Sequence, residues 1–425
     1  MRCDGYDALK VASRLGIIYL PRQVCYHIGQ DSHTMPGNAV LPAHGGMIIT
    51  RGLQEWACLL PQDLPFATAQ RLLGWQTQEP EILSATELRQ LVREHGQVIR
   101  TAEAAEVEAL LAQSDLSQLK PQLVPAWEPR RQAAWPEELN AAVEGALAAE
   151  MPHPPEGVSE EDWERVLAAR RAEQTLDTAT LARLGPEIWP DQVVVAPDEV
   201  KVRQPAKRSW WELRTARVAT AQGYRYLSGM GETFLRQLYL LILLCGGMTA
   251  LVTLLADGAR WIRAFFDQQL VHLPLKEFIL DWYHLKKKCY ELTSMICRGR
   301  KAKAQLLGSL LFSLWRGDVD AALARLENYR PEAKNEAKLD ELIAYIENRR
   351  FAIPNYQARR RERQFNGSGH GEKANDLLVT RRQKHKGMHW SLATSDALAA
   401  LKTLVLNHGW DLYWEKRQVL PLVAT

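Results

Sequence analysis

The feature that most constrains the fold is an uncharged stretch, Leu238–Ala256, which Gly246 and Gly247 interrupt in the middle. Its length approaches the roughly 20 apolar residues of a transmembrane helix. Two adjacent glycines favour a turn there, and the charged Asp257 follows the stretch at once. A buried helix, a Gly-Gly turn and a buried strand ending at Asp257 therefore explain the pattern better than a membrane span.

Short β-branched and aromatic runs precede this stretch. Val193–Val195 lead to Asp198, Trp210–Ala221 predicts a second strand, and Tyr224–Leu227 predicts a short third strand. Strands connected as hairpins and followed by a helix and another strand are typical of an α/β core with a mixed sheet. We expect this core to occupy residues 190–425.

Leucines at helical spacing predict an all-helical insertion in that core, over about residues 300–350. The repeating positions are Leu306, Leu307, Leu310, Leu311, Leu314, Leu323, Leu326, Leu339, Leu342 and Ile343. Such a stripe is typical of helices that pack against each other, so these leucines are expected in the core and not in a cofactor site.

Residues 1–115 are expected to form a helical region. The expected helices span Leu53–Leu60, Phe66–Leu73 and Ser84–His95. Ser84 and Glu87 have capping-box spacing at the start of the third helix. Three short helices with a tight turn match a helix-turn-helix module, whose last helix enters a major groove of DNA. Arg89 and Arg93 would share one face of that helix. An ordinary helical bundle is the alternative.

Residues 116–189 are expected to form a proline-rich linker followed by a helix. Prolines that break regular structure stand at Pro121, Pro125, Pro129, Pro136, Pro152, Pro154 and Pro155. A cap signal at Ser159 and Asp162 predicts a helix that runs to about Glu173.

Total charge and cysteine usage constrain function only weakly. The chain has 53 basic and 50 acidic residues, so its net charge of +3 does not by itself indicate nucleic acid. Six cysteines without a CxxC pair suit a reducing cytosol, and no signal-peptide pattern opens the sequence. Cys3, Cys25, His27 and His33 are a candidate metal knuckle, although unpaired thiols and surface histidines are the more ordinary interpretation.

Acidic residues carry the candidate chemistry. Asp198 and Asp257 each end an apolar strand, and strand-end carboxylates of a mixed sheet can converge at one edge. Glu372, which opens a helix after the turn Asn366–Gly369, would supply a third carboxylate. Carboxylates held together repel unless a cation lies between them, and oxygen ligands select Mg²⁺ or Mn²⁺. Each acid alone is more often a turn, cap or surface residue, so the hypothesis depends on the combination.

Several segments carry a family resemblance. They read MPGNAVLP (Met35–Pro42), ITRGLQEWACLLPQ (Ile49–Gln62), ADGARWI (Ala256–Ile262), LDWYHLKKKC (Leu280–Cys289) and NGSGHGEKANDLLVTRRQKHKGMHW (Asn366–Trp390). Asp281 and His284 have the D-x-x-H spacing of the Mutator-like group. The chain thus resembles bacterial insertion-sequence transposases with a DDE catalytic domain, in the Mutator-like group and similar to the ISKra-type enzymes.

The resemblance implies an RNase H-like catalytic core. Asp198, Asp257 and Glu372 would be its catalytic and metal-binding triad and would hold two Mg²⁺ or Mn²⁺ ions. His284 would position DNA or assist proton transfer, with a structural histidine as the alternative. Glu199 follows Asp198 where the family has glycine, so the first acid could be shifted by one residue.

The implied activity is metal-dependent cleavage and strand transfer on double-stranded DNA, both terminal inverted repeats and target DNA. The N-terminal region would bind the element's ends, and a homo-oligomer would act in the bacterial cytosol, associated with the nucleoid. Relatives carry a longer cysteine-bearing N-terminal segment, of which Cys3 and Cys25 would be a remainder. The alternatives are an RNase H-like nuclease without strand transfer and an inactive or recruited DNA-binding derivative.

Basic segments flank the proposed catalytic groups. Arg349–Trp390 holds eleven Lys or Arg and three acidic residues, and Asp281–Lys303 holds seven and two. Such charge gives salt-sensitive, sequence-independent affinity for DNA phosphates, although any one basic residue is more often simply solvated. The candidate DNA contacts are Arg89, Arg93, Lys286, Lys287, Arg381, Arg382 and Lys384. Trp390 is expected in the core and not as a base-stacking platform.

Overall fold

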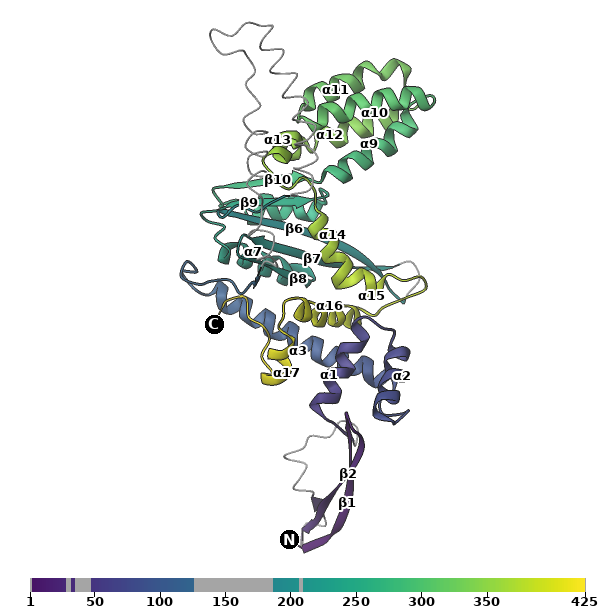
Figure 1. Ribbon diagram of the computed structural model, residues 1–425, viewed down its shortest axis with the longest axis vertical. Coiled ribbons are helices and arrows are strands. Elements are labelled where there is room, and N and C mark those ends of the chain that lie inside the picture. Colours follow the sequence, from purple (N-terminus) through teal and green to yellow (C-terminus); the bar gives the residue numbers. More distant parts are fainter. Residues whose placement is uncertain (1, 28–31, 35–46, 126–185, 206–208, 425) are drawn as a thin grey trace, which may run out of the picture.

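A computed structural model describes residues 2–27, 32–34, 47–125, 186–205 and 209–424. In this view a β-hairpin stands at one end, a group of helices stands at the other, and a mixed β-sheet lies between them (Figure 1). The helix predicted from Ser159 and most of the predicted linker lie outside the described residues.

The N-terminal end is a four-stranded sheet with the order β3-β2-β1-β4. Its strands are β1 (Arg2–Ser13), β2 (Gly16–His27), β3 (Ser32–Thr34) and β4 (Met47–Ile49). The prediction of a helical region over residues 1–115 is therefore wrong for its first part. Over Ala8–Val11, the buried Leu9 and Val11 alternate with the more exposed Ala8 and Lys10, and this period of two favours a strand. Gly16 allows the tight turn between β1 and β2 with φ of +98°.

Three helices follow where helices were predicted: α1 (Arg51–Leu59), α2 (Phe66–Thr77) and α3 (Ala85–Leu111). The predicted capping box at the start of α3 is confirmed. The Glu87 amide donates to Ser84 Oγ at 3.2 Å, and the Ser84 amide donates to Glu87 Oε2 at 2.7 Å. α3 runs well past His95 because its apolar face continues at helical spacing, through the buried Ile99 and Val107.

α3 packs closely against α16 (Leu392–Leu406), near the C-terminus of the chain. Gly96 makes this approach possible, since a Cβ at that position would overlap with Ala397. α3 is thus not a free recognition helix, because the face that carries Arg93 and Arg100 meets α16.

The central sheet has the order β10-β9-β6-β7-β8-β5. Its strands are β5 (Val124–Pro125), β6 (Gln192–Arg203), β7 (Trp210–Thr220), β8 (Gly223–Gly229), β9 (Leu251–Ala256) and β10 (Lys276–Leu280). β6, β7 and β8 are antiparallel neighbours, whereas β9 runs parallel to both β6 and β10. The predicted α/β class with a mixed sheet is confirmed.

The first predicted strand is longer than its valine run suggests. Pairing with β7 continues through Asp198, opposite Thr215, as far as Arg203. Asp198 therefore lies within β6 and does not end it, because the antiparallel partner supplies backbone hydrogen bonds beyond the apolar segment.

The uncharged stretch forms the predicted helix, turn and strand. α7 (Gly231–Leu244) ends before Gly246, which has φ of +91°, and β9 begins at Leu251. Among the described residues, no helix combines the length and apolarity that crossing a membrane requires.

The helical insertion lies at the opposite end of the molecule from the hairpin (Figure 1). It consists of α9 (Trp282–Ile296), α10 (Arg300–Trp315), α11 (Val319–Asn328) and α12 (Glu336–Glu347). Leu310, Leu314 and Leu339 are fully buried, as the leucine pattern predicted. The helices start directly after β10, earlier than residue 300, because α9 packs against α10 and α12.

The chain then returns along the sheet. It forms α13 (Tyr356–Arg361), α14 (Gly369–Asn375), a π-helical stretch (Asp376–Thr380), α15 (Arg381–Gln383), α16 and α17 (Trp410–Lys416). α14 packs against β6 and β7, and α16 packs against β8.

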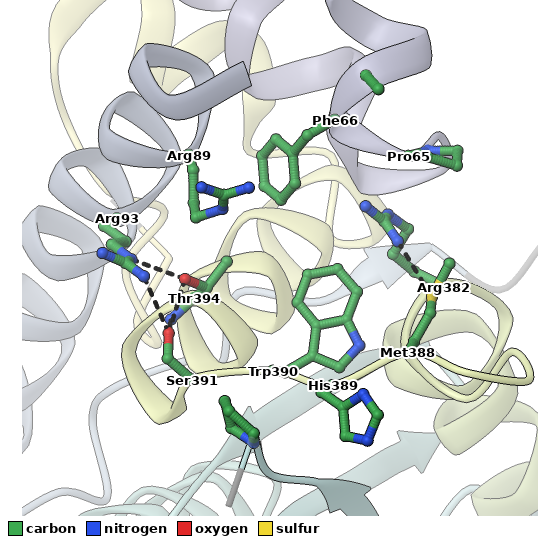
Figure 2. A pocket seen from close by; sticks show the side chains of 12 residues that line it. Pro65, Phe66, Arg89, Arg93, Arg382, Met388, His389, Trp390, Ser391 and Thr394 are labelled. Atoms are coloured by element: carbon green, nitrogen blue, oxygen red, sulfur yellow. Dashed lines mark hydrogen bonds between the residues drawn. The ribbon is translucent and has the colours of Figure 1, made fainter. Parts of the chain in front are cut away.

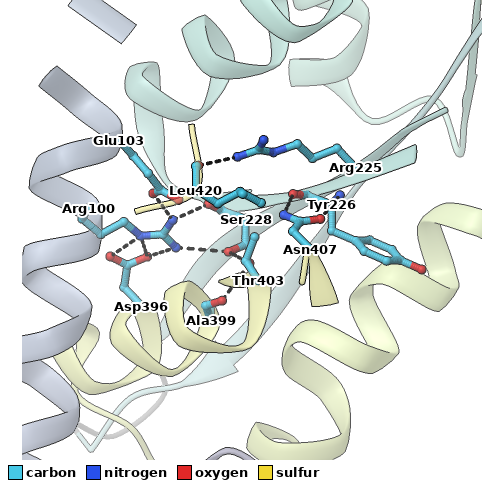
Figure 3. A network of polar contacts seen from close by, with 10 residues as sticks. All are labelled: Arg100, Glu103, Arg225, Tyr226, Ser228, Asp396, Ala399, Thr403, Asn407 and Leu420. Carbon is cyan, nitrogen blue, oxygen red and sulfur yellow. Dashed lines mark hydrogen bonds and ion pairs between the residues drawn. The ribbon is translucent and has the colours of Figure 1, made fainter. Parts of the chain in front are cut away.

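One buried network joins α3, α16 and the sheet (Figure 3). Arg100 donates to Asp396 Oδ1 at 2.9 Å and to Glu103 Oε2 at 2.8 Å. It also donates to the Ser228 carbonyl of β8 at 2.7 Å. These bonds fix the N-terminal helices to the sheet.

Candidate active site

Asp198 lies half-buried in β6, facing α14. Its Oδ1 accepts from the Glu199 amide at 2.7 Å, and its Oδ2 accepts from Asn375 Nδ2 at 2.5 Å. Burial and the charges of Asp257 and Glu372 raise the pKa of Asp198 to about 6, against the lowering effects of the Glu199 amide and His284. The charges of Asp257 and Glu372 thus both act on Asp198.

Asp257 follows β9 and stands level with Asp198. β6 and β9 are parallel with Val195 opposite Leu254, and each aspartate lies three residues beyond that pair. Asp257 Oδ1 accepts from the Ala259 amide at 2.9 Å, across Gly258, which has φ of +84°. The tight turn holds the carboxylate beside the neighbouring strand.

Asp281 links the insertion to the segment that carries Glu372. It caps α9, is buried, and accepts from the His284 amide at 2.9 Å and from Ser368 Oγ at 2.8 Å. Burial alone would raise the pKa of Asp281, but hydrogen bonds from His284 and Ser368 outweigh it and hold the pKa at about 2. Asp281 therefore stays ionised at neutral pH.

His284 lies between two carboxylates. Its Nδ1 is 3.3 Å from Asp281 Oδ1, and its Nε2 is 3.9 Å from Glu372 Oε1. Asp281 is the main cause of a raised pKa for His284, and Asp257 and Glu372 add to it. The structure thus brings four predicted site residues into one cluster: Asp198, Asp257, His284 and Glu372.

The donor set of this cluster suits a hard divalent cation, because it consists of carboxylates whose like charges already disfavour ionisation of Asp198. Asp198 Oδ2 is engaged by the Asn375 amide. In the described part of the chain, no three His, Cys, Asp or Glu side chains are arranged to hold a metal as they stand. At the candidate N-terminal knuckle, Cys3 and Cys25 are cross-strand partners in β1 and β2, and the side chain of His33 lies outside the described residues.

Glu199, the alternative first acid, stands on the other side of β6, because successive side chains of a strand point to opposite faces. Its pKa is raised by burial and by the charges of Glu212 and Asp257, and Lys201 opposes that rise. Asp198, and not Glu199, has its side chain bonded to α14.

Two residues of the cluster were missed in the sequence. Asn375 follows Glu372 by one helical turn, a spacing that places both on one side of α14, and its Oδ1 accepts from Thr215 Oγ1. Arg349 comes from the end of the insertion, and its guanidinium lies beside Gly258 and 4.0 Å above the Tyr345 ring. Only the i,i+3 spacing of Asn375 could have been found without the fold.

The predicted DNA contacts divide into two sets. Lys286 and Lys287 are exposed on α9, immediately after His284, and Lys384 is exposed after α15. Arg381 is exposed and pairs with Asp376 at 2.7 Å. The remaining three, Arg89, Arg93 and Arg382, line one pocket in a different part of the molecule (Figure 2). Trp390 is buried, as predicted, and its ring forms part of that pocket.

Comparisons with known proteins add no family to this geometry. No protein-family model matches the sequence, and no curated protein matches it.

Proposed function

We propose that this protein is a metal-dependent DNA transposase of the DDE type, with Asp198, Asp257 and Glu372 as its metal ligands. The observation that carries the proposal is the convergence of these acids with His284 at β6, β9, α9 and α14. Three acids and a histidine that approach from four separate elements, with the pKa of Asp198 and of His284 raised, are typical of a functional site.

The sheet order supports an RNase H-like core. Three antiparallel strands, β6 to β8, precede a helix and two parallel strands, β9 and β10, which lie on the other side of β6. The helical insertion falls between the second and third acids, where the resemblance implies it.

Divalent cations at this site would supply charge stabilisation for the attacking and leaving oxygens of a phosphodiester. A water oxygen attacks phosphorus, the bond to the 3′-oxygen breaks, and a 3′-hydroxyl is freed. That hydroxyl then attacks a target phosphodiester and releases its 3′-oxygen. Asp281 orients His284 toward Glu372, which places an imidazole beside the reacting oxygens for proton transfer. Lys286 and Lys287 offset the negative charge of the DNA phosphates.

The test is cleavage of a labelled duplex that carries the element's own end, in Mg²⁺ or Mn²⁺. Asp257→Asn should lower cleavage by more than about hundredfold while DNA binding persists, since even supporting residues of metal sites contribute about 10- to 100-fold. Glu199→Gln is the matched control, because this acid faces away from α14, and it should cut at the wild-type rate.

Other outcomes identify other functions. Cutting without joined products would indicate a nuclease, and end binding without cutting by any variant would indicate an inactive or recruited derivative. Equal cutting by wild type and Asp257→Asn would show that the acids are wrongly assigned. Two element ends must meet for transfer, so the active complex is proposed to be a homo-oligomer; a monomer in the paired-end complex would contradict this.

A further inference from the structure

A pocket of about 520 Å³ lies between the N-terminal helices and the segment that leads into α16 (Figure 2). It falls within the range of about 300–1,000 Å³ that is typical of ligand sites. Its lining includes three arginines, two aromatic side chains and a serine: Arg89, Arg93, Arg382, Phe66, Trp390 and Ser391. α2, α3 and the segment before α16 all contribute to it.

The charge of this pocket is positive and uncompensated. No Asp or Glu is among its lining residues. Arg93 donates from Nε to Thr394 Oγ1 at 2.7 Å and from Nη2 to Ser391 Oγ at 3.0 Å, and both partners are neutral. Arg382 is buried and donates from Nε to the Pro61 carbonyl at 2.6 Å.

The nearest acid that acts on Arg382 is Asp63, which is itself paired with Lys402 at 2.8 Å. Burial lowers the pKa of Arg382 only to about 10, so its guanidinium remains charged at neutral pH. Arg382 therefore adds to the positive charge that Arg89 and Arg93 bring to the pocket, and a bound anion would offset this charge.

Two further features accompany the arginines. α16 begins at Leu392 with Ser391 as its N-cap, so the positive end of a 15-residue helix opens on the pocket. Phe66 and Trp390 form an aromatic wall with ring centroids 6.3 Å apart, and the Arg382 guanidinium lies 4.6 Å over the Trp390 ring. Arg89 lies 5.2 Å over the Phe66 ring. Flat cationic and aromatic surfaces of this kind stack on nucleobases.

We propose that the pocket binds a single unpaired nucleotide of a DNA strand. The phosphate sits between Arg89, Arg93 and the N-terminus of α16, and the base packs against the side of the pocket that Phe66 and Arg382 line. A concave site admits one nucleotide, whereas a duplex groove is read by an element that projects from the protein. The choice of DNA as the nucleic acid rests on the proposed function; the phosphate and base chemistry comes from the pocket.

The test is calorimetric titration of the full chain with a 5′-phosphorylated DNA tetranucleotide, compared with inorganic phosphate and with a blunt duplex of the same sequence. We expect the tetranucleotide to bind most tightly and Arg89→Gln to weaken it about tenfold, the effect of one charge-assisted hydrogen bond. Phe66→Leu should weaken the tetranucleotide but not inorganic phosphate. Arg236→Gln, which removes an exposed arginine of α7 paired with Glu108, should leave binding unchanged.

Equal binding of phosphate and tetranucleotide would show that the pocket does not contact a base. Preference for the duplex would show that the pocket does not hold a single unpaired nucleotide. Either result would overturn the proposal. Unchanged binding by Arg89→Gln, with an unaltered thermal melt, would also overturn the proposal. Asp257→Asn should bind the tetranucleotide as wild type does. Binding to the pocket without any DNA cleavage would therefore count against the transposase proposal alone, and cleavage without such binding would count against the pocket alone.

Discussion

Two arginines of α3, Arg93 and Arg100, both face α16 and have opposite surroundings. Arg93 and Arg100 are two turns apart on α3, so both face α16. Arg100 meets the carboxylates of Asp396 and Glu103 (Figure 3), whereas Arg93 meets only the hydroxyls of Ser391 and Thr394 (Figure 2). The presence or absence of nearby acids therefore decides the role of identical side chains on one helix.

The physical basis is the cost of removing a charge from water. A paired and hydrogen-bonded ion can be buried at little net cost, and such a pair specifies how two elements dock. An unpaired cation at the edge of a pocket keeps its affinity for an anion from solution. The Arg100 network therefore fixes α3 to α16 and to the sheet. The pocket lined by Arg89, Arg93 and Arg382 remains available to a ligand.

The largest expected effect on stability comes from removing Arg100 from its network of carboxylates. Arg100→Met should lower the free energy of unfolding by about 3 kcal/mol, because Asp396 and Glu103 would be left without their partner. The lower end of the usual range applies since Asp396 keeps 26% of its side chain exposed. Urea denaturation measures this, with Arg89→Met as the matched control from the pocket, expected to change stability by less than about 0.5 kcal/mol. Equal losses in both variants would contradict the comparison.

Asp281 is an anionic counterpart of Arg100: a buried carboxylate that accepts hydrogen bonds from His284 and Ser368. Its pKa of about 2 lies below its ordinary value of 3.8, so its stabilisation is present above about pH 4 and is lost as the pH falls toward 2. Asp281→Asn should therefore reduce the free energy of unfolding by about 2 kcal/mol at pH 7 and by roughly half as much at pH 3. Urea midpoints of both proteins at these pH values measure it; a pH-independent difference would show that the charge of Asp281 is not what stabilises.

The smallest expected effect on stability comes from adding an acid to the pocket lined by Arg89, Arg93 and Arg382. Ser391→Asp would place a carboxylate beside Arg93 and at the N-terminus of α16, which should raise the free energy of unfolding by about 0.5 kcal/mol. The same change should abolish tetranucleotide binding, because the new carboxylate occupies the phosphate's partners. Asparagine has the size of aspartate without its charge, so Ser391→Asn should leave both the stability and the tetranucleotide binding near wild type. Tighter nucleotide binding by Ser391→Asp would contradict the model of an anion site.

Local sequence signals were sufficient for many elements. The Ser84–Glu87 capping box, the Gly246–Gly247 turn and the leucine repeat of the insertion each depend on neighbours within a few residues, and each was confirmed. The N-terminal hairpin was missed because its alternation is short and mixed with polar residues. The extent of β6 was missed because β7, a separate segment, supplies the hydrogen bonds that extend it beyond Asp198.

The candidate site divides in the same way. Asp257 and Glu372 could be selected because a strand end and a helix start are visible in the sequence. Asp198 was predicted to end a strand but lies within β6, and the pleat of β6 decides that Asp198, and not Glu199, faces α14. Arg349 gave no signal, since only the packing of the insertion brings it to Gly258. Arg89, Arg93 and Arg382 were selected as basic residues, but nothing in their spacing indicated a shared pocket.

The sequence by itself determined the type of most elements after the N-terminal hairpin, because periodicity, caps and turns act over one or two helical turns or strand pairs. The tertiary structure decided which charges meet. Arg100 finds Asp396 across 296 residues of chain, and Arg93 finds Thr394 across 301. Coulomb interactions and desolvation depend on distance in space and on burial, and neither quantity is encoded at any single position along the chain.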